Sequence, residues 1–193
     1  MPATAAHRTQ ALIIGAGVTG SGIARDLALR GIPSIVLEKR DVNAGASGGN
    51  HGLLHSGARY VYSDPAAAAE CRIEGELLKR LAPQCVEDCG GIFAVVAGDD
   101  ENYIADFPSL CARAGIAATP LSPAEARELE SALSPATIAA FAVPDAAVDP
   151  FELSLESLAQ ARALAGSRLL RGVRVVRFDT AGGRIVRVHC RDE

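Results

Sequence analysis

The chain begins with short apolar runs on either side of one amphipathic stretch. Residues 11–14 are uniformly apolar and end at Gly15, as in a strand buried on both faces of a parallel sheet. Residues 19–30 have apolar positions one helical turn apart and are followed by a glycine, so they predict a helix. Residues 35–37 predict a second buried strand. Strand, helix and strand in such close succession form a βαβ unit, so the sequence predicts an α/β fold with a parallel sheet.

Helical and extended patterns also alternate over the rest of the chain. Helices are predicted over residues 65–81, 101–114, 123–130 and 150–166, and strands over residues 92–96, 137–143, 168–170, 173–178 and 184–190. Ser122 and Glu125 form a capping-box pattern at one helix start, and Leu77 lies on the predicted apolar side of another helix. The last two strands are joined by residues 179–183, which predict a hairpin turn. Residues 1–10 predict a loose tail.

Composition and charge exclude several classes of protein. The 193 residues carry 19 basic and 23 acidic side chains, a net charge of −4, whereas a nucleic-acid-binding protein needs a basic face. No apolar run approaches the roughly 18 residues of a membrane-spanning helix. The first residues lack the apolar stretch of a secretory signal, so we expect a cytoplasmic protein. The five cysteines lack metal-ligand spacing, so no metal site is predicted.

A glycine-rich fingerprint lies between the first predicted strand and the first predicted helix. Gly15 permits a tight turn, Gly17 lets the backbone approach a pyrophosphate, and Gly20 lets helix and strand pack closely. The helix start supplies amide donors for the phosphates. Glu38 ends the second strand, where a carboxylate can accept both ribose hydroxyls and repels a 2′-phosphate. This Rossmann-like pattern predicts a site for FAD or NAD rather than NADP.

The segment that follows favours FAD over NAD. Residues 45–60 hold two histidines, an arginine and a tyrosine among five glycines. A long stretch of small side chains suits a backbone lying along an extended flavin dinucleotide, whereas an ordinary surface loop is the alternative. Ser47 and Asn50 can donate hydrogen bonds to phosphates or to the ribityl chain. We also place His51 among the cofactor-binding residues, where it shapes the loop.

Three motifs carry a resemblance to a known family. Residues 20–31, 50–60 and 148–151 resemble those of the FAD-dependent glycerol-3-phosphate dehydrogenases, most closely the large catalytic subunit of the anaerobic bacterial enzymes. The likeness runs from about residue 11 to the last residue. The motif over residues 50–60 is the specific one, because the wider D-amino-acid-oxidase-like superfamily shares only the fingerprint and a looser glycine-rich loop.

The resemblance implies a fold and a cofactor. It implies a glutathione-reductase-like, D-amino-acid-oxidase-type FAD-binding domain, interrupted by a smaller α+β substrate domain. Residues 1–85 and 146–193 would form the FAD-binding domain, and residues 86–145 the inserted substrate domain. The family continues beyond the position that matches Glu193, so we expect a fragment with an incomplete sheet that binds FAD weakly alone. Gly49 also stands where family members carry arginine.

The resemblance further implies a reaction. A hydride would pass from C2 of sn-glycerol 3-phosphate to FAD, giving dihydroxyacetone phosphate. Electrons would pass through partner subunits to a membrane quinone, which places the protein at the inner face of the cell membrane. Arg59 and Tyr60 would face the substrate, and His55 would lie by the flavin.

The residue types suit these roles and leave alternatives open. Arg59 offers a planar fork for phosphate oxygens, Tyr60 a hydroxyl donor, and His55 an acceptor for the C2 hydroxyl proton. Arg59 in a surface ion pair and His55 as a structural histidine are the plainer interpretations. One rival function is that of a related FAD-dependent 2-hydroxy-acid oxidase such as an L-2-hydroxyglutarate dehydrogenase, which shares the His-Ser-Gly loop but not the Ala-Arg-Tyr ending. Another is a truncated FAD-binding module without activity.

Overall fold

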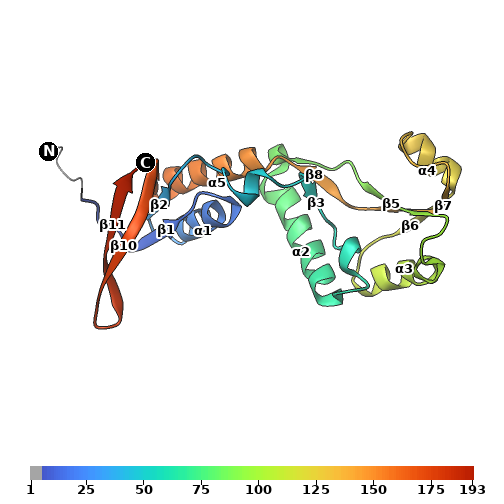
Figure 1. Ribbon diagram of the computed structural model, residues 1–193, viewed down its shortest axis with the longest axis horizontal. Helices are drawn as coiled ribbons and strands as arrows, with labels where there is room; N and C mark the ends of the chain where they lie inside the picture. The colour runs from blue at the N-terminus through green and yellow to red at the C-terminus, as the bar shows by residue number, and fades with distance from the viewer. Residues whose placement is uncertain (1–5) are drawn as a thin grey trace. The chain divides into compact units, whose positions relative to one another are not determined.

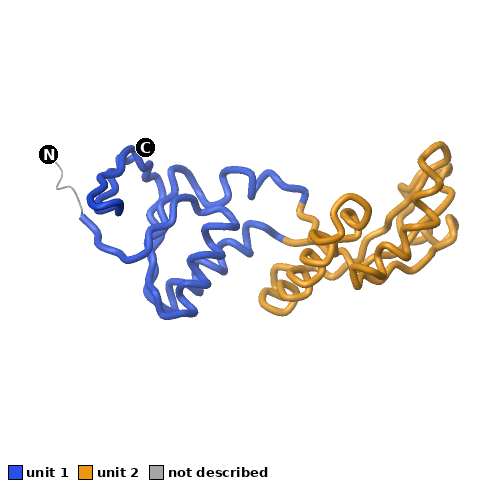
Figure 2. The backbone as a smooth tube through the Cα atoms, turned by 90° about the horizontal axis from the view of Figure 1, so that it is seen from below, with its two compact units in different colours: residues 1–51, 149–193 blue, residues 52–148 orange. Residues whose placement is uncertain are grey.

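The computed structural model describes residues 6–193 (Figure 1). The chain divides into two compact units, each with its own core (Figure 2). Unit 1 comprises Met1–His51 and Asp149–Glu193, and unit 2 comprises Gly52–Val148. Two predictions concern the N-terminal residues, namely a loose tail over residues 1–10 and the lack of a secretory signal. Both fall partly outside the described residues.

Unit 1 contains the predicted βαβ unit, which confirms the parallel α/β fold. Its sheet is an open set of three parallel strands in the order β1 (Ala11–Ile14), β2 (Ser34–Glu38) and β9 (Arg168–Arg171). Helix α1 (Val18–Leu29) connects β1 to β2 and packs against α5 (Pro150–Ala165). The side chains buried on these two helices are all small, which lets the helices lie close together: Gly20, Ser21, Ala24 and Ala28 on α1, and Ser154, Ser157 and Ala161 on α5.

The predicted hairpin closes unit 1 at the C-terminus. Strands β10 (Val173–Ala181) and β11 (Arg184–Asp192) pair antiparallel and are longer than predicted, so that only Gly182 and Gly183 form the turn. Both glycines have positive φ, which a two-residue turn of this kind requires. On one face, His189 Nε2 lies 2.7 Å from Asp179 Oδ2. This hydrogen bond holds the pKa of the Asp179 carboxyl below its ordinary value.

Unit 2 is built on an antiparallel sheet and an aromatic core. The sheet has the order β5 (Gly91–Val96), β7 (Thr137–Val143) and β6 (Thr119–Leu121). Its helices are α2 (Pro65–Leu81), α3 (Glu101–Arg113) and α4 (Pro123–Leu129), and the capping box of Ser122 and Glu125 is present at the start of α4. The core includes Phe107 and Phe141, with Phe93 packed against it.

Several short elements, most of them in unit 2, have no counterpart in the predictions. A second small sheet has the order β3 (Leu53–Leu54), β8 (Ala146–Val148) and β4 (Val86–Glu87). Strands of two or three residues are too short to show a period, and β6 contains a proline. Single turns of 3₁₀ helix, η1 (Ala46–Gly48) in unit 1 and η2 (Ala58–Tyr60) and η3 (Pro83–Cys85) in unit 2, were also not predicted.

The unit boundaries reflect packing and carry no information about ligands. The division into an FAD-binding domain over residues 1–85 and 146–193 and a substrate domain over residues 86–145 therefore stays a prediction. None of the helices formed by residues 6–193 is both long enough and apolar enough to cross a membrane.

Candidate functional site

The fingerprint glycines of unit 1 form a tight connection between β1 and α1. Gly15 has a φ of +105°, a left-handed conformation that favours glycine, and its amide donates to the carbonyl of Leu37 in β2 at 2.8 Å. A Cβ on Gly20 would lie 1.9 Å from the carbonyl oxygen of Gly15. The close approach of α1 to the end of β1 therefore depends on the absence of a side chain at Gly20.

Two polar side chains reach this connection from later in the sequence. Glu38 Oε2 accepts a hydrogen bond from the amide of Ala16 at 3.0 Å, so its carboxylate lies beside the glycine-rich turn. Ser47 Oγ accepts from the amide of Val18, the first residue of α1, at 3.1 Å. A Cβ on Gly17 would lie 2.8 Å from that hydroxyl. Gly17 thus leaves room for an oxygen atom in front of the helix start, and here the Ser47 hydroxyl fills it.

Asn43 holds the loop in place, and no sequence pattern identified it. It is buried and has a φ of +58°, a conformation that asparagine tolerates better than most residues. Its backbone amide donates to the carbonyl of Ala16 at 3.2 Å. Its side chain donates to the carbonyl of Pro150 at 2.6 Å and accepts from Ser154 Oγ at 3.0 Å. Asn43 therefore ties the fingerprint turn to the start of α5.

Asn50 and His51 are the remaining predicted cofactor residues. Both are exposed and lie after η1 at the end of the first segment of unit 1. The Asn50 side-chain amide donates to the carbonyl of Ser47, so Asn50 shapes the turn that carries the Ser47 hydroxyl. Of the seven predicted cofactor residues, these contacts bring five together around the start of α1, namely Gly15, Gly17, Gly20, Glu38 and Ser47.

The predicted catalytic residues lie in unit 2. The rings of His55 and Tyr60 are perpendicular, with centroids 6.4 Å apart. Arg59 lies between them in sequence, on η2, and is exposed. Gly57 adopts a φ of +99°, and a Cβ there would lie 2.1 Å from the carbonyl oxygen of Ala68. This close contact holds η2 against α2 and positions Arg59 and Tyr60.

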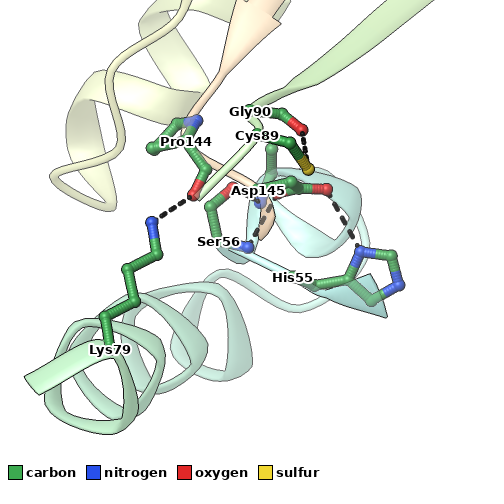
Figure 3. A network of polar contacts seen from close by, with 8 residues as sticks. His55, Ser56, Lys79, Cys89, Gly90, Pro144 and Asp145 are labelled. Carbon is green, nitrogen blue, oxygen red and sulfur yellow. Dashed lines mark hydrogen bonds and ion pairs between the residues drawn. The ribbon is translucent and has the colours of Figure 1, made fainter. Parts of the chain in front are cut away.

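A buried carboxylate contacts His55 (Figure 3). Asp145 Oδ2 lies 3.3 Å from His55 Nδ1, and Asp145 Oδ1 accepts from the amide of Ser56 at 2.8 Å and from its hydroxyl at 2.5 Å. The sequence patterns did not identify Asp145. Among residues 6–193, no group of three or more His, Cys, Asp or Glu side chains is arranged to hold a metal ion.

Comparison with known proteins places this geometry in a family. Residues 10–193 match the family described as FAD dependent oxidoreductase, abbreviated DAO. The chain belongs to this family. The match confirms the prediction of a D-amino-acid-oxidase-type fold and of a family that uses FAD. In addition, the chain and the L-proline dehydrogenase of P. horikoshii superpose with a TM-score of 0.83 at 24% sequence identity, over 96% of this chain and 50% of the other.

Curated members of the family confirm the resemblance to glycerol-3-phosphate dehydrogenases. The chain is 48% identical over 151 residues to a subunit of the anaerobic glycerol-3-phosphate dehydrogenase of Escherichia coli strain K12, covering 78% of this chain and 28% of that protein. It is 40% identical over 184 residues to the corresponding subunit of the Haemophilus influenzae enzyme, covering 95% of this chain and 32% of that protein. The matched region therefore spans only about a third of the length of these curated relatives.

Proposed function

We propose that this chain forms part of a flavin-dependent dehydrogenase that oxidises sn-glycerol 3-phosphate to dihydroxyacetone phosphate. The observation that carries the proposal is the identity of 48% with a protein named as a subunit of anaerobic glycerol-3-phosphate dehydrogenase. The structure supports it by grouping an imidazole, a guanidinium and a phenol on the short segment from His55 to Tyr60.

The residues around the start of α1 fit the adenosine monophosphate half of FAD. The Ser47 hydroxyl occupies the space that Gly17 leaves before the helix, and a phosphate oxygen of FAD would take that place, because the amides at the start of α1 favour phosphate. Glu38 supplies a carboxylate for the ribose hydroxyls, and Ser47, Asn50 and His51 supply polar groups along the loop. FAD, when bound, supplies the hydride acceptor of the reaction.

The chain's own residues bind and orient the substrate. Arg59 is exposed and permanently charged, and its planar fork binds phosphate oxygens through paired hydrogen bonds. Tyr60 donates a further hydrogen bond. The imidazole of His55 accepts the C2 hydroxyl proton as the hydride leaves C2, so proton and hydride depart to separate acceptors.

Partners and location belong to the same proposal. The relatives are named as subunits, which supports an assembly in which electrons pass through partner subunits to a membrane quinone. The protein would then be cytoplasmic and held peripherally at the inner face of the cell membrane. Residues 1–85 and 146–193 would serve FAD, and residues 86–145 the substrate.

Glu38→Gln is expected to weaken FAD binding about tenfold, equivalent to about 1.4 kcal/mol. The amide keeps an oxygen for the Ala16 amide but loses the charge that strengthens its hydrogen bonds to ribose hydroxyls. Equilibrium titration followed by flavin fluorescence measures the change. Glu74→Gln, an exposed substitution on α2, is the matched control and should leave FAD affinity unchanged. Equal affinities for the Glu38 variant and the unaltered chain would exclude this role for Glu38.

Arg59→Lys is expected to raise KM for sn-glycerol 3-phosphate at least about tenfold, because lysine keeps the charge and loses the paired hydrogen bonds. Steady-state kinetics on the enzyme that contains this chain measure the effect. Arg127→Lys, on the short helix α4, is the control for the general effect of replacing an arginine by a lysine outside the predicted site residues. An unchanged KM for the Arg59 variant would mean that Arg59 is a surface residue that does not bind the substrate.

Reduction of the bound flavin without oxygen tests the function itself. In the enzyme that contains this chain, sn-glycerol 3-phosphate is expected to bleach the flavin absorbance, and L-2-hydroxyglutarate is not. Bleaching by L-2-hydroxyglutarate alone would replace the proposal with a 2-hydroxy-acid oxidase. Bleaching by neither compound would leave a module that binds FAD without this activity.

A further inference from the structure

Asp145 is a buried carboxylate whose two oxygens contact neighbouring residues of one loop. It lies between β7 and β8 and is 8% exposed. Oδ1 accepts two hydrogen bonds from Ser56, at 2.8 Å from the amide and 2.5 Å from the hydroxyl. Oδ2 lies 3.3 Å from His55 Nδ1 (Figure 3). Because Ser56 occupies one oxygen, the other is directed at the imidazole.

The surrounding fold fixes the position of this carboxylate. The ammonium group of Lys79, on α2, donates to the carbonyl of Pro144 at 3.2 Å, and it pairs with Asp88 Oδ1 at 2.6 Å. Gly91, at the start of β5, has no side chain, and a Cβ there would lie 2.9 Å from Asp145 Cβ. Contacts from α2 and β5 therefore hold the backbone on which Asp145 is carried.

This arrangement selects one tautomer of His55. An ionised carboxylate only accepts hydrogen bonds, so the His55 Nδ1 that faces it carries the proton. In the neutral ring Nε2 is then the basic nitrogen. A free histidine side chain in water prefers the opposite tautomer, with the proton on Nε2, so Asp145 imposes a state that the residue alone does not favour.

We propose that Asp145 is a positioning residue for the oxidation of the substrate hydroxyl. It holds the proton of His55 on Nδ1, so that Nε2 accepts the hydroxyl proton, and it stabilises the imidazolium that forms. This role in the reaction rests on the proposed function. The tautomer itself does not, because it is argued from the contact between Asp145 and His55 within unit 2.

A second histidine in contact with an aspartate lies in unit 1. His189 Nε2 lies 2.7 Å from Asp179 Oδ2. The guanidinium of Arg177, which only donates, lies 3.0 Å from the same Nε2, so the contacts of His189 do not select one tautomer. Asp179 therefore serves as a control carboxylate that contacts a histidine outside the candidate site.

Nitrogen NMR of the chain labelled with ¹⁵N-histidine tests the tautomer without FAD or substrate. The spectra are recorded over a range of pH, and the tautomer is read where the ring is neutral. His55 is expected to show a protonated Nδ1, with its signals assigned by their loss in His55→Gln. Asp145→Asn is expected to shift the proton to Nε2, because Ser56 keeps the amide oxygen and the amide NH₂ then faces Nδ1. Asp179→Asn, the matched control, should leave His55 unchanged.

Kinetics of the enzyme that contains this chain test the role in the reaction. Asp145→Asn is expected to lower kcat at least about 100-fold while KM changes less than about threefold, since only proton transfer is impaired. A protonated Nε2 on His55 in the unaltered chain would overturn the proposal, whatever the Asp145 variant shows. An unchanged kcat in the Asp145 variant would also overturn it. If the unaltered enzyme does not oxidise sn-glycerol 3-phosphate, the proposed function fails, whereas the NMR result still decides the tautomer.

Discussion

Gly20→Ala is expected to destabilise unit 1 by about 3 kcal/mol and to abolish FAD binding. The added Cβ would lie 1.9 Å from the carbonyl oxygen of Gly15 and 3.3 Å from Ile13 Cγ2. The nearest atom belongs to the backbone and cannot rotate away, so α1 and the end of β1 must separate. That separation displaces the turn whose amide donates to Leu37 in β2. Urea unfolding followed by circular dichroism measures the loss of stability.

A second glycine of the same helix provides the control. Gly22 is exposed on α1, and a Cβ there meets no atom within 4 Å. Gly22→Ala is expected to leave stability unchanged or to raise it by about 0.5–1 kcal/mol, since alanine has the higher helix propensity. If both variants unfolded at the same urea concentration, close packing at Gly20 would not be the cause.

Phe107→Ala is expected to destabilise unit 2 by about 3–5 kcal/mol. Phe107 is 1% exposed on α3, and its ring centroid lies 5.0 Å from that of Phe93 and 5.1 Å from that of Phe141. Truncation removes these contacts and leaves a cavity between α3 and the sheet. Chemical unfolding measures the free-energy change.

A nearby tyrosine provides an independent measure of the same change. Burial raises the pKa of Tyr103, whose ring centroid lies 5.6 Å from that of Phe107. Loss of the Phe107 ring lets water reach the phenol, so its pKa is expected to fall toward the ordinary value in an ultraviolet titration. Leu129→Ala is the control, because this leucine is 68% exposed on α4 and its truncation should change stability by less than about 0.5 kcal/mol. Equal losses in the two variants would contradict a core role for Phe107.

The elements that the sequence predicted well are those specified by local signals. The βαβ unit follows from two apolar runs around a helix, and α4 from the capping box of Ser122 and Glu125. Strands β3 and β8 were missed because their pairing joins Leu53 to Ala147, far apart in the sequence, over only two pairs. Leu77 lies on the side of α2 expected to be buried and is nevertheless exposed, since a helical pattern does not specify which residues a helix packs against.

The same distinction applies to the candidate site. The fingerprint glycines and Glu38 lie within one supersecondary motif of known geometry, so their proximity could be predicted. Asn43 carried a weak signal, an asparagine in a polar stretch where positive φ is tolerated. Asp145 carried no signal in the sequence. Its contact with His55 depends on how the chain between β7 and β8 folds back beside the loop that holds His55.

Competition between FAD and FMN tests most directly the claim that unit 1 holds a flavin dinucleotide. FMN lacks the adenosine monophosphate part that the fingerprint turn and Glu38 are proposed to bind. In fluorescence titrations of the folded chain, FAD is expected to bind, and FMN to bind at least about tenfold more weakly, a difference of about 1.4 kcal/mol. The Gly20→Ala variant should lose the FAD signal. Equal affinities for FAD and FMN, or an FAD signal that survives Gly20→Ala, would contradict the assignment of the cofactor site to this turn.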